Sequence, residues 1–310
     1  MDAGRKTKVL LTGASGFLGF NLMSLLKTEF ELYGTYCANR PPTGRYRFIK
    51  LDVTSQESVR EVLETVHPEV IIHAAAKADV DFCESNHDVS FRVNVRGSEN
   101  LVKQAGLIGA RFIYLSTDLV FDGEEGDYSE DDNPNPTSFY GATKLEAEKQ
   151  LLNVLDKAVV LRLSLMYGNR GYGNVGFVHR LLGSLKTGES FRLFTDQYRT
   201  PLYLEDVAVA LKRIVLDMNF RGLYHLGGPK RVSRWEFGQV LAEVFGFSEK
   251  LLLPIKMEDL PEMLARPRDC SLDSTKICRK LDLRPTTVRQ GLQKLKREMS
   301  VNRRDSNWQN

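Results

Sequence analysis

The chain has few cysteines: Cys37, Cys83, Cys270 and Cys278 are the only four among its 310 residues. None of them forms a C-x-x-C pair, and no group of cysteine and histidine has the spacing of a zinc site. An apolar run of membrane-spanning length is missing too, and no stretch of signal-peptide length precedes the first glycines. We therefore expect a cytoplasmic protein in a reducing environment, without a membrane partner and without a bound metal.

The chain also has little excess charge, since 43 basic and 40 acidic residues leave a net charge of +3. The basic excess lies between Lys276 and Asn310. We interpret that stretch as a solvated helix and tail, because no aromatic residue interleaves with its charges before Trp308. Seven acidic residues between Asp122 and Asp132 are interpreted as a solvated loop, because acids without regular spacing rarely share a coordination sphere. No nucleic-acid partner is expected.

Apolar runs alternate with helical patterns through the first half of the chain. Strands are expected at residues 8–12, 31–36, 46–51, 70–73, 111–116 and 158–163, and helices at 17–27, 55–66, 89–105 and 138–155. This alternation predicts right-handed crossovers and an α/β fold whose doubly wound, Rossmann-like parallel sheet is covered on both faces.

The pattern loosens after about residue 166, where helices alternate with isolated strands such as 223–226. We expect a smaller C-terminal substrate-binding lobe built onto the edge of the sheet. The predicted division is a dinucleotide-binding domain with the catalytic residues at 1–165, a mainly substrate-binding lobe at 166–298 and a polar tail at 299–310.

Three glycines separate the first expected strand from the first expected helix, in the segment TGASGFLG. Gly13 allows a tight turn, Gly16 lets a pyrophosphate approach the backbone, and Gly19 lets the helix pack closely on the strand. The exposed N–H groups of the helix start favour a phosphate. The position of the motif favours dinucleotide binding over an ordinary turn. The loop residues expected to hold the cofactor are Gly13, Ser15, Gly16, Phe17, Leu18 and Gly19.

The second expected strand runs into GTYCANR, which contains no acidic residue. An acid at this point usually holds the ribose hydroxyls of NAD. Arg40 stands nearby instead, and an arginine can pair with the ribose phosphate of NADP. The sequence thus favours NADP(H), with NAD(H) as the alternative if Arg40 is an ordinary solvated charge.

Tyr140 and Lys144 are four residues apart in SFYGATKLEAEK, so on a helix they share one face. A free tyrosine has a pKa of roughly 10, and a neighbouring ammonium is expected to lower it toward a useful value. Lys144 can also hold the cofactor ribose. We interpret the other charged residues of this helix, Glu146, Glu148 and Lys149, as its exposed surface.

Thr117 stands at the end of the fifth expected strand, and such strand ends face the binding crevice of an open parallel sheet. Its hydroxyl can donate a hydrogen bond to a substrate carbonyl oxygen, although a lone threonine here is often only a cap. Thr117, Tyr140 and Lys144, in this order behind the glycine loop, predict hydride chemistry between a carbonyl and an alcohol.

The G-x-x-G-x-x-G spacing is typical of the short-chain dehydrogenase/reductase superfamily, and the chain resembles its extended branch. The resemblance implies that Asp52 and Val53 lie beside the adenine. It also implies that small residues line the cofactor after the fourth strand and that an asparagine of the following helix belongs to the site. The matching residues here are Ala74, Ala75, Ala76 and Asn94.

The segments STDLVFDG, NPNPTSFYGATKLEAE, DQYRTPLYLEDVA and ARPRDCSLDSTK are similar to dTDP-4-dehydrorhamnose reductases. They are also similar to a related protein, the regulatory beta subunit of methionine adenosyltransferase. The resemblance extends from about Lys8 to Lys296. It implies an NADPH-dependent reduction of the 4-keto group of a nucleotide-linked deoxysugar, as in dTDP-rhamnose biosynthesis.

The resemblance also implies roles for the site residues. Tyr140 protonates the developing alkoxide, Lys144 tunes Tyr140, Thr117 orients the oxygen, and Asp118 contacts substrate or braces the loop. Substrate phosphates are expected near Arg199 and Arg266, with a surface salt bridge as the alternative for each. Relatives often form dimers, which makes a homodimer one expected state.

Two other functions stay open at this stage. One is a regulatory subunit that binds NADP without chemistry, and Leu165 and Met166 favour it because the reductases often have a tryptophan there. The other is an epimerase or dehydratase with tightly held NAD. Sugar-nucleotide dehydratases carry Thr-Asp-Glu where this chain has Thr117, Asp118 and Leu119, which disfavours the dehydratase.

Overall fold

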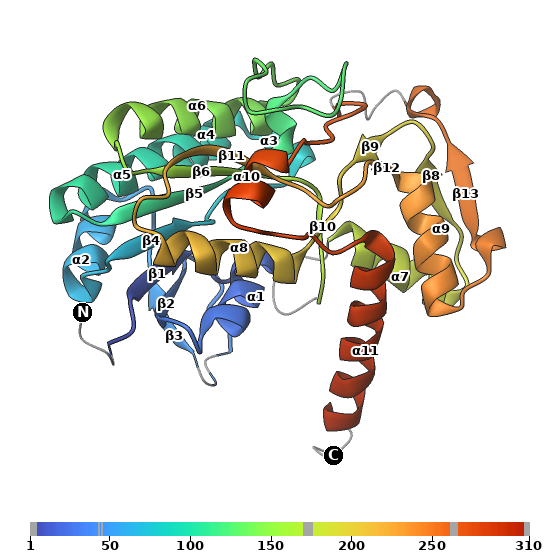
Figure 1. The fold of residues 1–310 in the computed structure, drawn as a ribbon, viewed down its shortest axis with the longest axis horizontal. Coiled ribbons are helices and arrows are strands. Elements are labelled where there is room, and N and C mark those ends of the chain that lie inside the picture. Colours follow the sequence, from blue (N-terminus) through green and yellow to red (C-terminus); the bar gives the residue numbers. More distant parts are fainter. Residues whose placement is uncertain (1–4, 43, 45, 170–175, 261–265, 307–310) are drawn as a thin grey trace.

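A seven-stranded parallel sheet forms the centre of the fold (Figure 1). The computed structural model describes residues 5–42, 44, 46–169, 176–260 and 266–306, and its strand order is β11-β6-β5-β4-β1-β2-β3. The strands are β1 (Lys8–Thr12), β2 (Glu31–Tyr36), β3 (Arg47–Lys50), β4 (Val70–His73), β5 (Arg111–Thr117), β6 (Val159–Leu163) and β11 (Gly222–Leu226). Every neighbouring pair is parallel, so the predicted doubly wound sheet is confirmed.

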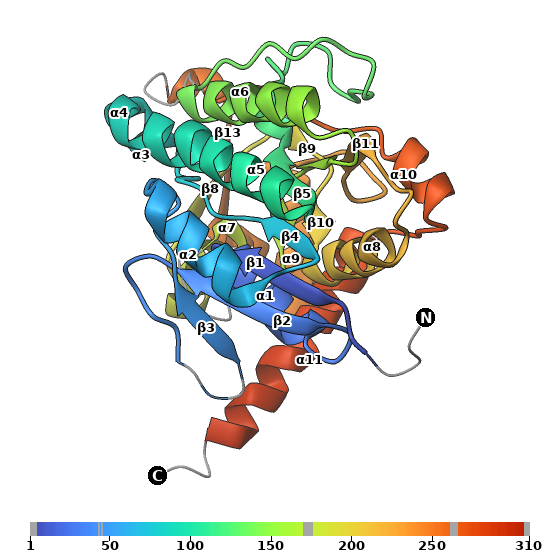
Figure 2. The same cartoon turned by 90° about the vertical axis from the view of Figure 1, so that its left-hand side faces the viewer.

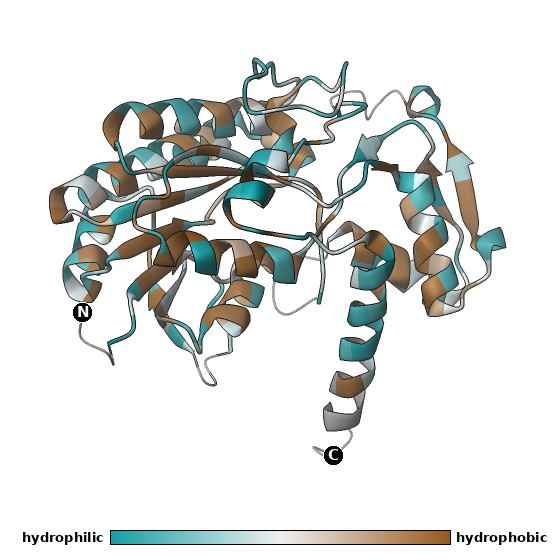
Figure 3. Ribbon diagram, viewed as in Figure 1, coloured by the Kyte–Doolittle hydropathy of each residue, from teal (hydrophilic) through white to brown (hydrophobic). Residues whose placement is uncertain are grey.

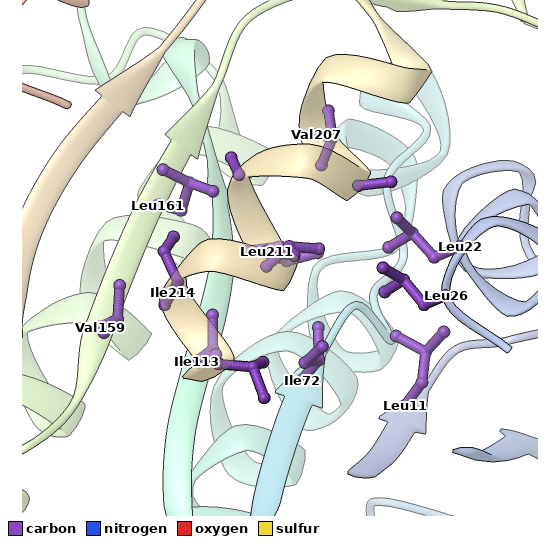
Figure 4. Close-up of a cluster of buried hydrophobic side chains, with 14 of the residues drawn as sticks. Leu11, Leu22, Leu26, Ile72, Ile113, Val159, Leu161, Val207, Leu211 and Ile214 are labelled. Atoms are coloured by element: carbon purple, nitrogen blue, oxygen red, sulfur yellow. The ribbon is translucent and has the colours of Figure 1, made fainter. Parts of the chain in front are cut away.

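Helices cover both faces of this sheet because its central strands are apolar on both sides. One face packs against α1 (Phe17–Leu26) and α8 (Leu204–Leu216), where Leu22 and Leu211 meet Ile72 and Ile113 (Figure 4). The other face packs against α2 (Gln56–Val66), α5 (Gly97–Ile108) and α6 (Phe139–Val154). Each fully buried aliphatic side chain contributes roughly 1.5–3 kcal/mol. Figure 3 shows the resulting hydrophobic strands between helices with polar outer faces.

A second group of elements lies beside the sheet and has its own apolar core (Figure 1). It contains α7 (Phe177–Thr187), α9 (Arg234–Phe245) and α11 (Val288–Ser306), together with β8 (Phe191–Phe194) and β13 (Leu252–Ile255). The short pairs β9 (Tyr198–Arg199) with β12 (Val232–Ser233), and β7 (Met166–Tyr167) with β10 (Leu202–Tyr203), connect this group to the sheet. Helix α11 extends away from the body in both views (Figure 2).

The remaining elements are short. They are α3 (Val80–Ser85), α4 (His87–Phe91), the π-helix η1 (Arg92–Arg96), the 3₁₀ turns η2 (Asp118–Val120), η3 (Glu249–Leu251) and η4 (Met257–Asp259), and α10 (Thr275–Lys280). No helix in the described part of the chain is long and apolar enough to cross a membrane.

The second half of the chain also contributes a strand and a helix to the central sheet and its covering layer. The segment expected as an isolated strand is β11, which pairs with β6 and ends with Leu226 opposite Leu163. Helix α8 also returns to cover one face of the sheet. The domain limits at residues 165 and 298 stay predictions, and α11 runs through the second of them to Ser306.

Candidate functional site

The carboxyl ends of β1, β4 and β5 lie side by side, as parallel pairing requires. Thr12 pairs with His73, and His73 pairs with Tyr114, three residues before Thr117. This register places the glycine loop, the alanines after β4 and the Thr117 segment along one edge of the sheet. In open α/β sheets that edge is where ligands bind.

The glycine loop has the geometry of a phosphate cradle. Gly13 has a positive φ of 68°, and a Cβ atom there would lie 2.7 Å from the backbone of Ala75. A Cβ atom on Gly19 would overlap the carbonyl oxygen of Gly13. Helix α1 begins after Gly16 with no side-chain cap and no acidic residue in its first turn, so its N–H donors remain for an anion. Ser15, Phe17 and Leu18 form the same turn and are partly exposed, so the loop fits a dinucleotide.

The other residues expected to hold the cofactor lie in two nearby loops. Arg40 is exposed after β2 and has no ion-pair partner within the described ranges. The Asp52 carboxylate accepts hydrogen bonds from the backbone N–H (2.9 Å) and hydroxyl (2.7 Å) of Thr54, which fixes the turn after β3. Val53 is buried against Gly97. The contacts of these residues with a cofactor stay predictions.

His73 joins the glycine loop to the helix layer through one chain of hydrogen bonds. The Thr12 hydroxyl accepts from the Ala75 N–H (3.2 Å) and lies 2.7 Å from His73 Nδ1, while His73 Nε2 lies 2.9 Å from the Ser98 hydroxyl. Ser98 donates to the carbonyl of Asn94 at 2.6 Å, so His73 must donate at Nε2 and accept at Nδ1. Burial lowers the pKa of His73 to about 3, which keeps this ring neutral.

Asn94 lies in the π-helix η1 and is buried. Its amide nitrogen donates to the Lys77 carbonyl and to the Thr143 hydroxyl, both at 3.0 Å, and its oxygen accepts from the Lys77 N–H at 2.8 Å. These bonds tie the loop after Ala74–Ala76 to helix α6. Asn94 therefore positions that loop, and its direct contact with a cofactor stays a prediction.

Tyr140 lies in the first turn of α6, which the Ser138 hydroxyl caps by accepting from the Gly141 N–H at 3.1 Å. The phenol is buried, and the start of α6 packs against the turn after Thr117, since a Cβ atom on Gly141 would overlap the Leu119 carbonyl oxygen. Burial, and next to it the charge of Asp118, raise the pKa of Tyr140. The phenol is consequently neutral at neutral pH and able to give a proton.

Lys144 lies one turn further along α6, and its ammonium nitrogen is 3.9 Å from the centroid of the Tyr114 ring. Burial lowers the pKa of Lys144 to about 7, and the charge of Glu148 opposes this. The pKa of Tyr140 is nevertheless raised overall, because burial is the largest influence on it. A spacing of four residues places Tyr140 and Lys144 on the same face of the helix, but it does not determine where the ends of these two long side chains lie.

Asp118 is buried and braced from three sides. Its carboxylate pairs with the Arg199 Nε atom (3.3 Å) and accepts from the hydroxyls of Ser164 (3.3 Å) and Thr117 (3.1 Å). Burial raises the pKa of Asp118, and Arg199 opposes this. Of the two roles expected for Asp118, the structure shows the bracing contacts.

The two arginines expected at the substrate phosphates have protein partners. Besides Asp118, Arg199 donates to the carbonyls of Tyr198 (2.6 Å) and Pro267 (3.3 and 3.4 Å), so nearly all its donors are used. Arg266 is partly exposed and pairs with Asp81 on α3 at 2.6 Å. Their role in substrate binding stays a prediction, and Arg199 also holds the Asp118 loop.

Two charged residues have positions in the structure that the sequence analysis did not predict. Glu148, expected on the exposed face of its helix, is 2% exposed and paired with the equally buried Arg162 at 2.7 Å. The reason is that Arg162, on β6, brings a charge into the interior that Glu148 must neutralise. Arg234 at the start of α9 was missed, since nothing in its sequence neighbourhood distinguishes it from a surface arginine.

Comparisons with known proteins agree with this architecture. The model of the RmlD substrate binding domain family matches residues 7–301. A probable low-salt glycan biosynthesis reductase, Agl14 of Haloferax volcanii, is 35% identical over 271 residues, covering 86% of this chain and 90% of that protein. The beta subunit of methionine adenosyltransferase 2 from Bos taurus is 32% identical over 279 residues, covering 87% of this chain and 81% of that protein.

Among solved structures, a dTDP-4-dehydrorhamnose reductase of Bacillus anthracis in complex with NADP superposes with a TM-score of 0.84. It is 28% identical, and the superposition covers 95% of this chain and 100% of that chain. The resemblance drawn from the sequence segments is thereby confirmed. The relatives nevertheless include both reductases and a subunit of methionine adenosyltransferase 2.

Proposed function

Because the chain belongs to the RmlD substrate binding domain family, we propose that it catalyses the NADPH-dependent reduction of the 4-keto group of a nucleotide-linked deoxysugar. The observation that carries the proposal is the close packing of the start of α6, which carries the buried Tyr140, against the turn that follows Thr117. A Cβ atom on Gly141 would overlap the Leu119 carbonyl oxygen of that turn, and Lys144 lies one helical turn further along α6. A neutral proton donor beside a second hydroxyl suits a carbonyl oxygen that gains negative charge. The names of the reductase relatives and the NADP bound to one of them support the substrate class and cofactor.

The role proposed for each residue of the site follows from its position. The glycine loop and the start of α1 would hold the pyrophosphate of the cofactor, and Arg40 its ribose phosphate. When bound, the reduced nicotinamide supplies a hydride to the carbonyl carbon of the substrate. Thr117 donates a hydrogen bond to the carbonyl oxygen and orients it. Tyr140 gives its proton to that oxygen, and the nearby ammonium of Lys144 stabilises the phenolate left behind.

A regulatory role is the second candidate, because the matched beta subunits are named as parts of methionine adenosyltransferase. This chain has all three of Thr117, Tyr140 and Lys144, and each of them is buried, which a subunit without chemistry does not require. The complete constellation therefore favours the reductase. A homodimer, implied by the resemblance, is part of the same proposal.

The decisive experiment supplies dTDP-4-keto-6-deoxy-mannose and follows the absorbance of NADPH and, separately, of NADH. We expect oxidation of NADPH, with NADH slower by about tenfold if Arg40 meets the ribose phosphate. Equal rates would remove Arg40 from cofactor selection. Oxidation of neither cofactor would put the regulatory role first.

The rate of reduction should fall as the pH rises through the pKa of Lys144, which burial lowers to about 7. Below that pH Lys144 is an ammonium and can stabilise the phenolate of Tyr140, and above it this charge is lost. The neighbouring His73 does not titrate in this window because its pKa is about 3. Tyr140 stays protonated because burial raises its pKa.

This pH dependence is checked by measuring kcat/KM for the keto sugar from about pH 6 to about pH 9. Lys149→Gln is the matched control, since Lys149 is exposed on the same helix, and it should keep the midpoint of the native protein. A flat profile across this range in the native protein would contradict the role given to Lys144.

A further inference from the structure

Tyr114 lies in the middle of the sheet, on β5 and three residues before Thr117. It pairs with His73 of β4 on one side and with Val160 of β6 on the other. Its side chain is 1% exposed and belongs to the apolar core between the sheet and helices α2, α5 and α6. Because close-packed neighbours surround it, the ring has a fixed position.

The face of this ring contacts the ammonium of Lys144. The Lys144 Nζ atom lies 3.9 Å from the centroid of the Tyr114 ring, and Lys144 is 2% exposed. A cation is attracted to the electron-rich face of an aromatic ring, and the attraction is stronger where water is excluded. Burial raises the pKa of Tyr114 well above its ordinary value, so this ring is a neutral phenol that attracts through its face.

The other buried titratable groups around Lys144 are neutral or already paired. Glu148, one turn further along α6, raises the pKa of Lys144, but its carboxylate pairs with Arg162 at 2.7 Å. The His73 ring is tilted against the Tyr114 ring at 5.5 Å, and burial keeps it neutral by lowering its pKa to about 3. Burial likewise keeps Tyr140 on α6 and Cys83 on α3 neutral, since it raises both pKa values.

The remaining charges on the elements packed against α6 also have partners or lie at the surface. Asp118, in the turn after β5, pairs with Arg199 at 3.3 Å. Glu99 on α5 pairs with Arg96 and Lys103, both at 2.8 Å. The other charged or titratable side chains of α3, α4 and η1 are exposed, namely Asp81, Glu84, His87, Asp88 and Arg92.

We propose that Tyr114 is a positioning residue of the reductase, whose ring face holds the Lys144 ammonium in place and in its charged form. The spacing along α6 gives Tyr140 and Lys144 a common face, and the ring of Tyr114 then determines where the end of the lysine lies. Tyr114 acts only through Lys144 and has no contact with substrate in this proposal. The inference rests on the proposed function, in which Lys144 stabilises the phenolate of Tyr140.

Removing the ring face should make Lys144 lose its proton at lower pH. The face stabilises the ammonium and not the neutral amine, so its loss lowers the pKa of Lys144. That pKa is about 7 with the ring in place. A desolvated contact of this kind is large enough to change a pKa by about one unit, so we expect about 6 without it.

The test is an NMR titration of Lys144 in the full chain, with isotopically labelled lysine, from about pH 5 to about pH 9. The Lys144 signal is identified by its absence in Lys144→Met. Tyr114→Phe keeps the ring face, a variant with trifluorophenylalanine in place of Tyr114 weakens it at nearly constant shape, and Tyr114→Leu removes it. We expect the native pKa in Tyr114→Phe, a lower pKa in the fluorinated variant and the lowest in Tyr114→Leu.

The same variants are assayed with the keto sugar and NADPH. The basic limb of kcat/KM should move to lower pH in the fluorinated variant and in Tyr114→Leu, by the same amount as the pKa of Lys144. Tyr114→Phe should keep the native limb. A purely structural role would lower the rate at every pH without moving the limb, and that result would overturn the inference.

Phe112→Leu is the matched control. Phe112 is two residues earlier on the same face of β5, is 1% exposed and meets the His73 ring edge-on at 5.8 Å. Its replacement removes a buried ring from the same core and should leave the pKa of Lys144 unchanged. A native pKa in Tyr114→Leu, or an equal shift in Phe112→Leu, would contradict the role of Tyr114. If Tyr114→Leu does not fold, the fluorinated variant decides by the same titration.

The NMR titration needs no substrate, so the two proposals fail separately. A protein in which Tyr114→Leu lowers the pKa of Lys144, yet which oxidises no NADPH with the keto sugar, would contradict only the reductase function. A protein that turns over the keto sugar while Lys144 titrates alike in all the variants would contradict only the role of Tyr114.

Discussion

Replacing Tyr140 by phenylalanine should lower kcat by a factor of about 10²–10⁴, the usual contribution of a positioned general acid. The substitution removes one oxygen from a phenol that is buried at the start of α6, beside the turn that follows Thr117. The ring itself stays in place, so the packing of the first turn of α6 should change little. Because the glycine loop holds the pyrophosphate at a different strand end, NADPH affinity should stay within about twofold.

The measurement is single-turnover reduction of the keto sugar, combined with a fluorescence titration of NADPH binding. Tyr33→Phe is the matched control, since the Tyr33 hydroxyl bonds Glu31 on β2 at 2.9 Å and has no role in the proposed site. It should keep the native kcat. Full activity in Tyr140→Phe would remove Tyr140 from the mechanism, whereas loss of NADPH binding would show a structural defect instead.

The strands were predictable because their physical signal is local and strong. β1, β2 and β4 have the bounds expected from the sequence, and β1 and β4 are short, mainly apolar runs. Parallel pairing then places all their carboxyl ends at one edge. The positions of Gly13 and Thr117 along that edge therefore followed from the order of strands alone.

Features set by tertiary contacts were not predictable in this way. The expected helix at 89–105 is divided by the π-helix at Arg92–Arg96, which carries Asn94. A π-helical turn contains one extra residue, and the periodicity of the apolar residues does not reveal it. β11 was expected as an isolated strand, because its partner β6 lies about 60 residues earlier in the chain. Only the strand pairing in the folded protein brings Leu226 opposite Leu163.

The electrostatics of the site also depend on how deeply each side chain is buried, which is difficult to predict from the sequence. The i, i+4 spacing of Tyr140 and Lys144 gave their shared face correctly. The net direction of the Tyr140 pKa could not be obtained from that spacing, because desolvation raises it. Arg234 shows the same limit, since only the fold reveals that its Nη1 atom is buried.

Glu148, one helical turn beyond Lys144 on α6, anchors a buried polar chain. Its carboxylate accepts from the Ser116 hydroxyl and from Arg162 at Nε (3.1 Å) and Nη2 (2.7 Å). Arg162 Nη1 can only donate, so His225 accepts at Nε2 (3.3 Å) and its Nδ1–H donates to the Tyr128 carbonyl at 3.0 Å. Burial lowers the pKa of His225 to about 4, so the chain contains one neutral ring between charged and backbone groups.

Glu148→Gln should therefore lower the free energy of unfolding by about 3–5 kcal/mol, because it leaves the Arg162 charge buried without its carboxylate. Urea denaturation measures the loss, and Glu146→Gln on the same helix, at a partly exposed position, should change it by less than about 0.5 kcal/mol. Adding Arg162→Met to Glu148→Gln should restore most of the stability, because the second substitution removes the uncompensated buried charge.

Glu148→Gln should also change the pH dependence of the activity, which a loss of stability alone would not change. Glu148 raises the pKa of Lys144 against the effect of burial. In Glu148→Gln the basic limb of the pH profile should therefore shift to lower pH, at a temperature where the variant is folded. If the variant is as stable as the Glu146→Gln control, the Glu148–Arg162 pair is not the anchor described here. If it is unstable but keeps the native pH profile, Glu148 supports the fold without tuning Lys144.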